Sequence, residues 1–220
     1  MLIAYWSVKG GSGTTVVAVT HALQVARSGP SPSPVVLVDL AGEAATVLGV
    51  RGVGSAPSGA DAGDLLDRAT PVVDGLVLVS AGEVGPAPPG DPAAPAVGEQ
   101  LVATLGGLNN VVVVDCGVPA ADGMAARVAA AADRSLLVVR PCFLAMRRAI
   151  AAPLRPSGVV LVAEPQRALG RSDIEAVLGV PVVAEVPHDP VIARAVDAGL
   201  LATRLPRVLD RAFRQPGVAA

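Results

Sequence analysis

Short runs of apolar residues recur along the chain, and each run has the length of a β-strand. Within a run the apolar positions are mostly continuous and do not alternate with polar ones. This pattern is typical of strands that are buried on both faces of a parallel sheet. The predicted strands are Leu2–Val8, Val35–Asp39, Leu76–Ser80, Val111–Asp115, Leu136–Arg140, Val159–Ala163 and Val182–Val186.

Segments with helix-forming composition separate these strands. They carry Ala, Leu and Val in patterns that favour an α-helix. The predicted helices are Thr14–Ser28, Glu99–Leu105, Ala120–Ala132, Cys142–Leu154, Ser172–Leu178 and Pro190–Ala198. The alternation of strand and helix predicts an α/β fold with a doubly wound, mostly parallel sheet, helices on both faces, and ligands at the carboxyl ends of the strands.

Three stretches rich in Gly, Pro, Ala and Ser interrupt this alternation, namely Ser28–Pro34, Arg51–Gly63 and Gly82–Gly98. Proline removes a backbone donor and glycine costs backbone entropy, so we predict surface loops there. Whether Gly82–Gly98 binds a partner is left open. A chain of 220 residues that is 52% hydrophobic can bury one substantial core, and we expect a single domain over residues 1–220.

Composition narrows the class of protein. A formal net charge of −2 supplies no overall basic field for nucleic acid. The two cysteines, Cys116 and Cys142, fit no metal-ligand spacing and form no disulfide framework, so we expect reduced core residues. No basic region precedes the first apolar run, and no apolar stretch approaches the ~20 residues that span a bilayer. We therefore expect a soluble, cytoplasmic protein.

A glycine-rich turn lies between the first predicted strand and the first predicted helix. Glycines at three of its positions let the backbone approach phosphates, and the helix N-terminus adds partial positive charge. Thr15 lies where a hydroxyl would bind Mg²⁺. The candidate nucleotide-binding residues of this turn are Lys9, Gly10, Gly11, Ser12, Gly13, Thr14 and Thr15.

Lys9 is the only lysine in a chain that has 16 arginines. The sequence thus uses arginine for its other cations and keeps a compact ammonium inside the glycine turn. A planar guanidinium differs in shape from a point charge and fits less easily among phosphates. The lone lysine strengthens the prediction of a phosphate-binding loop.

The segment from Lys9 to Thr15 resembles the deviant Walker A motif, Lys-Gly-Gly-x-Gly-Lys-Thr/Ser, of the ParA/MinD ATPases. Further segments are similar to parts of that family in the same order. They are the second strand with Asp39 in Val35–Leu40, the third strand and its turn in Leu76–Gly82, the Walker B strand in Val111–Asp115, and a late strand in Val182–Pro187.

The resemblance implies an ATP-binding protein with Mg²⁺ that acts as a homodimer through its nucleotide face, with a further, unidentified protein partner. It implies that Lys9 reaches the nucleotide of the other subunit and that Pro187 and Asp189 lie near the base. Catalysis would involve Lys9 and Asp39, and Mg²⁺ would be held near Thr15, Asp39 and Asp115. An Asp at a strand end is also an ordinary turn or cap residue. The sequence alone therefore does not decide between a metal-binding role and a structural role for Asp39 and Asp115.

Two positions depart from the family's pattern. Thr14 replaces the second lysine of the loop, and Ala41 replaces the second acid of an Asp-x-Asp pair. Both parts support phosphoryl transfer, so we expect binding with slow hydrolysis. The loop is similar to the degenerate loops of TadZ/CpaE-type relatives. Arg140 ends a predicted strand, and we hypothesise that it supplies the missing charge; the alternative is a solvent-facing arginine.

Other features have plainer interpretations. His21 and His188 are predicted to be structural. The segment Arg204–Arg214 is either a last core helix, which we favour, or a basic amphipathic helix that contacts membrane or DNA at the membrane or nucleoid surface. Two rival functions are a scaffold for protein interaction without nucleotide chemistry, and an enzyme of the dethiobiotin synthetase or nitrogenase-reductase kind, whose further motifs are not evident.

Overall fold

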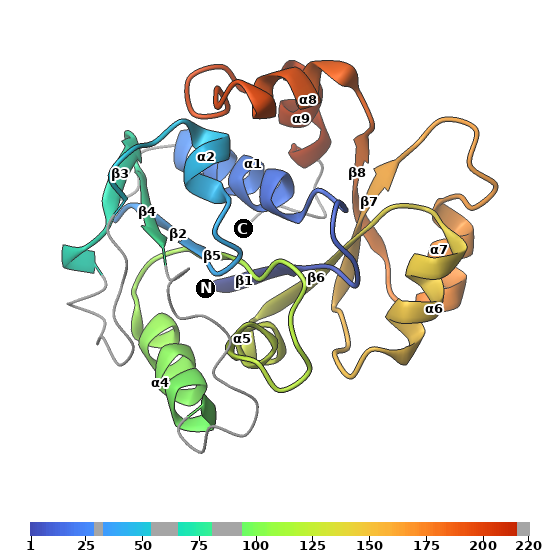
Figure 1. The fold of residues 1–220 in the computed structure, drawn as a ribbon, viewed down its shortest axis with the longest axis horizontal. Helices are drawn as coiled ribbons and strands as arrows, with labels where there is room; N and C mark the ends of the chain where they lie inside the picture. Colours follow the sequence, from blue (N-terminus) through green and yellow to red (C-terminus); the bar gives the residue numbers. More distant parts are fainter. Residues whose placement is uncertain (29–32, 54–65, 81–93, 215–220) are drawn as a thin grey trace.

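A computed structural model describes residues 1–28, 33–53, 66–80 and 94–214, and within them an 8-stranded sheet forms the centre of the molecule (Figure 1). The strand order is β3-β4-β2-β5-β1-β6-β7-β8. The strands are β1 (Leu2–Trp6), β2 (Val35–Asp39), β3 (Thr70–Val73), β4 (Leu76–Ser80), β5 (Val112–Asp115), β6 (Arg134–Val139), β7 (Gly158–Ala163) and β8 (Val182–Pro187).

Strand pairing is parallel throughout the described sheet except between β3 and β4, which pair antiparallel at one edge. The first strand lies in the middle, hydrogen-bonded to β5 on one side and to β6 on the other. All the parallel strands therefore end at the same edge, which is where the turn after β1 emerges. The predicted α/β fold with a mostly parallel sheet is confirmed.

Helices cover both faces of this sheet (Figure 1). One layer consists of α1 (Thr14–Arg27), α2 (Ala44–Leu48), α8 (Pro190–Asp197) and α9 (Arg207–Phe213). The other layer consists of α4 (Ala94–Gly107), α5 (Met124–Ala131), α6 (Phe143–Ala151) and α7 (Arg171–Leu178). The two layers match the doubly wound arrangement expected from the alternation of strands and helices.

The central strand shows why its apolar run is continuous. Successive side chains of a strand point to opposite faces of the sheet. Ile3 and Tyr5 pack in the core beneath α1, whereas Leu2, Ala4 and Trp6 pack in the core on the opposite face. All five are buried, so neither face of β1 has room for a solvated polar side chain.

Two elements were not predicted from the sequence, and two helices begin several residues away from the predicted start. The helix α2 has five residues, too few to show a helical period, and β3 is a partly exposed edge strand that contains Pro71. The helix α5 begins at Met124, four residues after the predicted start at Ala120. The helix α4 begins at Ala94, so the last residues of the predicted loop Gly82–Gly98 are helical. Residues 81–93 of that loop, and most of Ser28–Pro34 and Arg51–Gly63, lie outside the described residues.

The last helix belongs to the core, as predicted for Arg204–Arg214. Three of its side chains, Leu209, Ala212 and Phe213, are buried. His21 accounts for part of this packing, because its ring stacks on Phe213 with centroids 5.9 Å apart. Its Nδ1 lies 2.8 Å from the Tyr5 hydroxyl, which supports the structural role predicted for this histidine. None of the described helices is both long and apolar enough to cross a membrane.

Candidate functional site

The glycine-rich turn occupies residues 7–13, between the end of β1 and the start of α1. Its backbone is held to the segment after β5, where the Ser7 N–H donates to the Gly117 carbonyl at 2.8 Å. The hydroxyls of Ser7 and Ser12 both donate to the Lys9 carbonyl, at 3.1 and 2.9 Å. The two serines thus fix the path of the turn with short local bonds.

The glycines leave this turn open on its outer side. Gly11 and Gly13 have φ of 73° and 89°, which is the left-handed region that side chains disfavour. A Cβ placed on Gly10 or Gly11 would meet nothing within 4 Å. The backbone can therefore be approached closely by a ligand at these positions.

The N-terminus of α1 follows directly and carries no side-chain cap. Gly13 is the N-cap residue, and the first turn of the helix contains no acidic residue. The uncapped N–H groups and the helix dipole leave partial positive charge at the mouth of the turn. Thr14 and Thr15, the first two helical residues, are each only 7% exposed. Together, turn and helix form a ready site for an anion.

Asp39, at the end of β2, is buried and accepts three hydrogen bonds from backbone N–H groups. Its Oδ1 accepts from the N–H groups of Ala41 at 3.0 Å and Gly42 at 2.7 Å. Its Oδ2 accepts from the N–H of Ala44, the first residue of α2, at 2.8 Å. Two donors fill Oδ1, and Oδ2 keeps one lone pair. Asp39 therefore acts as a turn and cap residue, which is one of the two roles predicted for it. Only its Oδ2 retains capacity to accept a hydrogen bond from a metal-bound water.

Asp115, at the end of β5, differs from Asp39 in its partners. Its side chain is fully buried, Oδ1 accepts from the Gly117 N–H at 3.0 Å, and Oδ2 has no hydrogen-bond partner. Burial raises the pKa of this carboxyl from 3.8 to about 6. Interaction with the Thr15 hydroxyl and the Gly117 N–H opposes the rise, and the charge of Asp39 adds to it.

An unpartnered buried oxygen points to a ligand that the protein itself does not supply. The described residues hold no cluster of three or more His, Cys, Asp or Glu that would form a complete metal cage. Mg²⁺ needs none, since it is held by one or two carboxylates together with waters and phosphate oxygens. Asp115 and Thr15 are thus the residues that fit Mg²⁺ best among those predicted.

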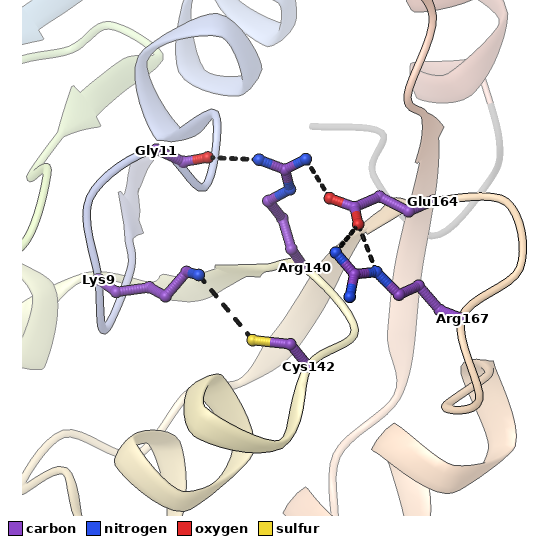
Figure 2. A network of polar contacts seen from close by, with 6 residues as sticks. All are labelled: Lys9, Gly11, Arg140, Cys142, Glu164 and Arg167. Atoms are coloured by element: carbon purple, nitrogen blue, oxygen red, sulfur yellow. Dashed lines mark hydrogen bonds and ion pairs between the residues drawn. The ribbon is translucent and has the colours of Figure 1, made fainter.

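Lys9 extends from the turn toward the start of α6 (Figure 2). Its Nζ lies 3.9 Å from the Sγ of Cys142, the N-cap residue of that helix. Cys142 is half-buried and packs against the edge of the core, so the prediction of a core thiol holds only in part for this residue. The other cysteine, Cys116, is buried as predicted, and its burial raises the pKa of the thiol.

The contact between Lys9 and Cys142 forms because β6 and α6 pass beside the turn, which the local sequence does not show.

Arg140 has a side chain that is 31% exposed, in keeping with the solvent-facing alternative, and it also has partners within the protein. Its Nη1 donates to the Gly11 carbonyl at 3.3 Å, and its Nη2 forms an ion pair with Glu164 (Figure 2). Glu164 had no candidate role in the sequence. Its position just after β7, one strand along from Arg140 just after β6, is the signal that would have paired them.

Protein-family models and curated protein sequences gave no match to this chain. Solved structures match it over nearly its whole length. The septum site-determining protein MinD complexed with Mg-ADP from Pyrococcus horikoshii OT3 has a TM-score of 0.71 and 22% identity, covering 96% of this chain and 92% of that one. The ParA family ATPase from Chlorobium tepidum TLS has a TM-score of 0.68 and 17% identity, covering 96% and 98%. The chain has the ParA/MinD fold.

An ATP complex of a Cyanothece McdA variant is similar at a TM-score of 0.69 and 14% identity, and covers 100% of this chain and 98% of that chain. At these identities the likeness concerns the ParA/MinD fold and not the activity. The fold accounts for the central placement of the turn after β1, with Asp39 and Asp115 beside it as register partners on β2 and β5.

Pro187 and Asp189, predicted near the base, lie at the carboxyl end of the outermost strand β8 on the same edge of the sheet. Pro187 is exposed. Asp189 caps α8, since its side chain accepts from the Val191 N–H at 2.8 Å. The N–H of His188 donates to the Ala163 carbonyl at 2.8 Å and ties this segment to the end of β7. The structure thus collects the phosphate residues centrally and leaves these two at the sheet's edge.

Proposed function

We propose that this protein binds ATP with Mg²⁺ at the turn after β1 and acts as a nucleotide-dependent positioning or regulatory switch. The observation that carries the proposal is the buried, unpartnered Oδ2 of Asp115 beside an open glycine turn and an uncapped helix. Phosphates satisfy the turn and the helix, and Mg²⁺ satisfies the carboxylate. ATP with Mg²⁺ would therefore bind to the glycine turn, the helix N-terminus and the Asp115 carboxylate at the same time.

The nucleotide complexes of the similar structures support the proposal. The Pyrococcus MinD is complexed with Mg-ADP, and the Cyanothece McdA variant is complexed with ATP. When bound here, Mg²⁺ would supply positive charge between the phosphates and Asp115, with Thr15 as a further ligand. Lys9 and the backbone of residues 10–13 would hold the phosphates.

The switch acts as a homodimer through the same face. Large apolar side chains lie exposed around the turn: Phe143 is 74% exposed, Leu144 is 49% exposed and Val118 is 51% exposed. Phe143 follows Cys142, which contacts Lys9, and Val118 follows Gly117, which binds Ser7. Covering these side chains with a second copy would bury apolar area close to Lys9, whose ammonium then reaches the other subunit's nucleotide.

Hydrolysis is proposed to be slow. Thr14 provides no cation at the loop, and Ala41 provides no carboxylate. The same two residues favour a second candidate function, a pseudo-ATPase scaffold that keeps the fold for protein interaction alone. The two functions differ in whether nucleotide changes the oligomeric state.

The proposal is tested by titration calorimetry with ATP and Mg²⁺, followed by light scattering after size exclusion with and without the nucleotide. Wild type is expected to bind ATP and to form dimers when ATP and Mg²⁺ are present. Lys9→Ala is expected to stay monomeric. Arg211→Ala, which removes an exposed cation from α9 on the opposite face of the sheet from α6, serves as the control and is expected to behave as wild type. Wild type and Lys9→Ala behaving alike, without ATP binding, would support the scaffold.

A further inference from the structure

The carboxyl ends of β6 and β7 place a charged network against the phosphate loop (Figure 2). Arg140 follows the last residue of β6, and Glu164 follows the last residue of β7. The Arg140 guanidinium lies between the loop and the carboxylate, donating to the Gly11 carbonyl at 3.3 Å and pairing with Glu164. A cation from another part of the chain is therefore anchored on the loop itself.

Glu164 acts as the anchor of this network. Its side chain is only 10% exposed, and it also accepts from Nε of Arg167 at 2.5 Å. Burial alone would raise the pKa of Glu164, but the hydrogen bond from Arg167 and the charges of both arginines hold it below its usual range. The carboxylate is thus charged, and two guanidinium groups against one carboxylate leave the network with a net positive charge.

Arg140 retains capacity for a further anion. A guanidinium has five N–H donors in a planar fork, and the contacts with Gly11 and Glu164 use a part of them. Its side chain is 31% exposed, which leaves it reachable from outside. Arg167 is 50% exposed and belongs to the network through its ion pair and hydrogen bond with Glu164.

We propose that Arg140 is the second cation of the phosphate site, held by Glu164 as its positioning residue, and that it binds the polyphosphate of a nucleotide. It takes the place of a lysine at position 14, where the buried Thr14 carries no charge. A guanidinium supplies two parallel donors to phosphate oxygens, which a hydroxyl does not. This inference rests on the proposed function, because it concerns the same site.

The experiment measures the affinity of ATP and of inorganic pyrophosphate for wild type, Arg140→Ala, Arg140→Lys and Arg167→Ala. Arg140→Ala is expected to weaken both ligands about tenfold or more, the loss of a charge-assisted hydrogen bond. Arg140→Lys retains part of the affinity. The matched control Arg167→Ala removes the same charge from the same carboxylate and is expected to stay within about threefold of wild type.

Salt separates a phosphate ligand from a merely structural arginine. The gap between wild type and Arg140→Ala is expected to shrink between about 0.01 M and about 1 M salt, because the Debye length falls from about 30 to about 3 Å. Thermal unfolding shows that each variant is folded. An affinity of Arg140→Ala within about threefold of wild type, or a gap independent of salt, overturns the role of Arg140.

The outcomes for the two proposals are distinct. Wild type that binds neither ATP nor pyrophosphate overturns both the nucleotide function and the role of Arg140. Wild type that binds pyrophosphate but not ATP overturns the nucleotide function only. Wild type that binds ATP with an affinity unaffected by Arg140→Ala leaves the function standing and overturns this inference.

Discussion

Asp39 and Asp115 end neighbouring parallel strands and are register partners across β2 and β5, yet their surroundings differ. Asp39 receives three backbone N–H groups from the turn that follows it. Asp115 receives one on Oδ1, and its Oδ2 is buried without a partner. The same residue type thus stabilises the fold at one strand end and is left for a ligand at the next. The number of N–H groups that donate to a buried carboxylate thus indicates whether it stabilises the fold or is available to a ligand.

The largest expected effect concerns the structural member of the pair. Asp39→Ala leaves the N–H groups of Ala41, Gly42 and Ala44 without their acceptor inside the protein. We expect the free energy of unfolding to fall by about 3 to 5 kcal/mol, since each of the three bonds contributes a net amount of about 1 to 1.5 kcal/mol once water reaches the exposed turn. Urea unfolding followed by circular dichroism measures it, and a loss below about 1 kcal/mol would erase the contrast.

The pH dependence of stability is expected to report Asp115. Its folded pKa of about 6 lies above its ordinary value of 3.8, so the native state holds this proton where the unfolded state has lost it. Stability therefore falls as pH rises from about 4 to about 6, by about 3 kcal/mol at most, since one pKa unit corresponds to about 1.4 kcal/mol. Above about pH 6 Asp115 is ionised in both the folded and the unfolded state, so it causes no further change in stability.

Asp115→Asn is expected to remove this pH-dependent component, because an amide does not titrate there. Urea unfolding of wild type and Asp115→Asn across this pH range makes the comparison. Asp197→Asn, a change on the exposed end of α8, is the control and should keep the wild-type profile. Parallel profiles for all three proteins would show that Asp115 titrates normally.

The ligand-binding member of the pair is tested by affinity. Asp115→Asn is expected to lower the affinity for ATP in the presence of Mg²⁺ about tenfold, because the neutral amide replaces the carboxylate that faces the metal. Without Mg²⁺ the two proteins should bind ATP alike. Titration calorimetry in both conditions checks this, with Asp197→Asn again as the control. An equal loss with and without Mg²⁺ would contradict a metal role.

The smallest effect on stability is expected from Ala41→Asp. Ala41 is exposed, and its contact with Asp39 is through the backbone N–H, which the substitution keeps. The free energy of unfolding should change by no more than about 0.5 kcal/mol. The carboxylate restores the acid that the family resemblance implies, so ATP hydrolysis in a phosphate-release assay should increase. An unchanged rate would indicate that Thr14 alone limits hydrolysis.

The sequence predicted the strands well because both faces of the sheet are covered, which leaves a continuous apolar run that few other elements produce. Predictions were poorer where an element is short or lies at an edge. The helix α2 is brief, and β3 is formed by pairing with β4, not by its own pattern. The C-terminal helix was predicted correctly because its apolar spacing matches the face that packs on α1 and β8.

Local order along the chain was sufficient to predict the glycine turn, its lone lysine and the two strand-end aspartates as a candidate site. Each of these features lies in one continuous segment, and its chemistry depends on residues a few positions apart. Only the tertiary structure decided that both carboxylate oxygens of Asp39 have backbone donors whereas Oδ2 of Asp115 has none. It alone also decided that Lys9 contacts Cys142 and that Glu164 holds Arg140 against Gly11. Burial and donor count depend on what the other strands and turns bring to the same place, and that information is absent from any single segment of the chain.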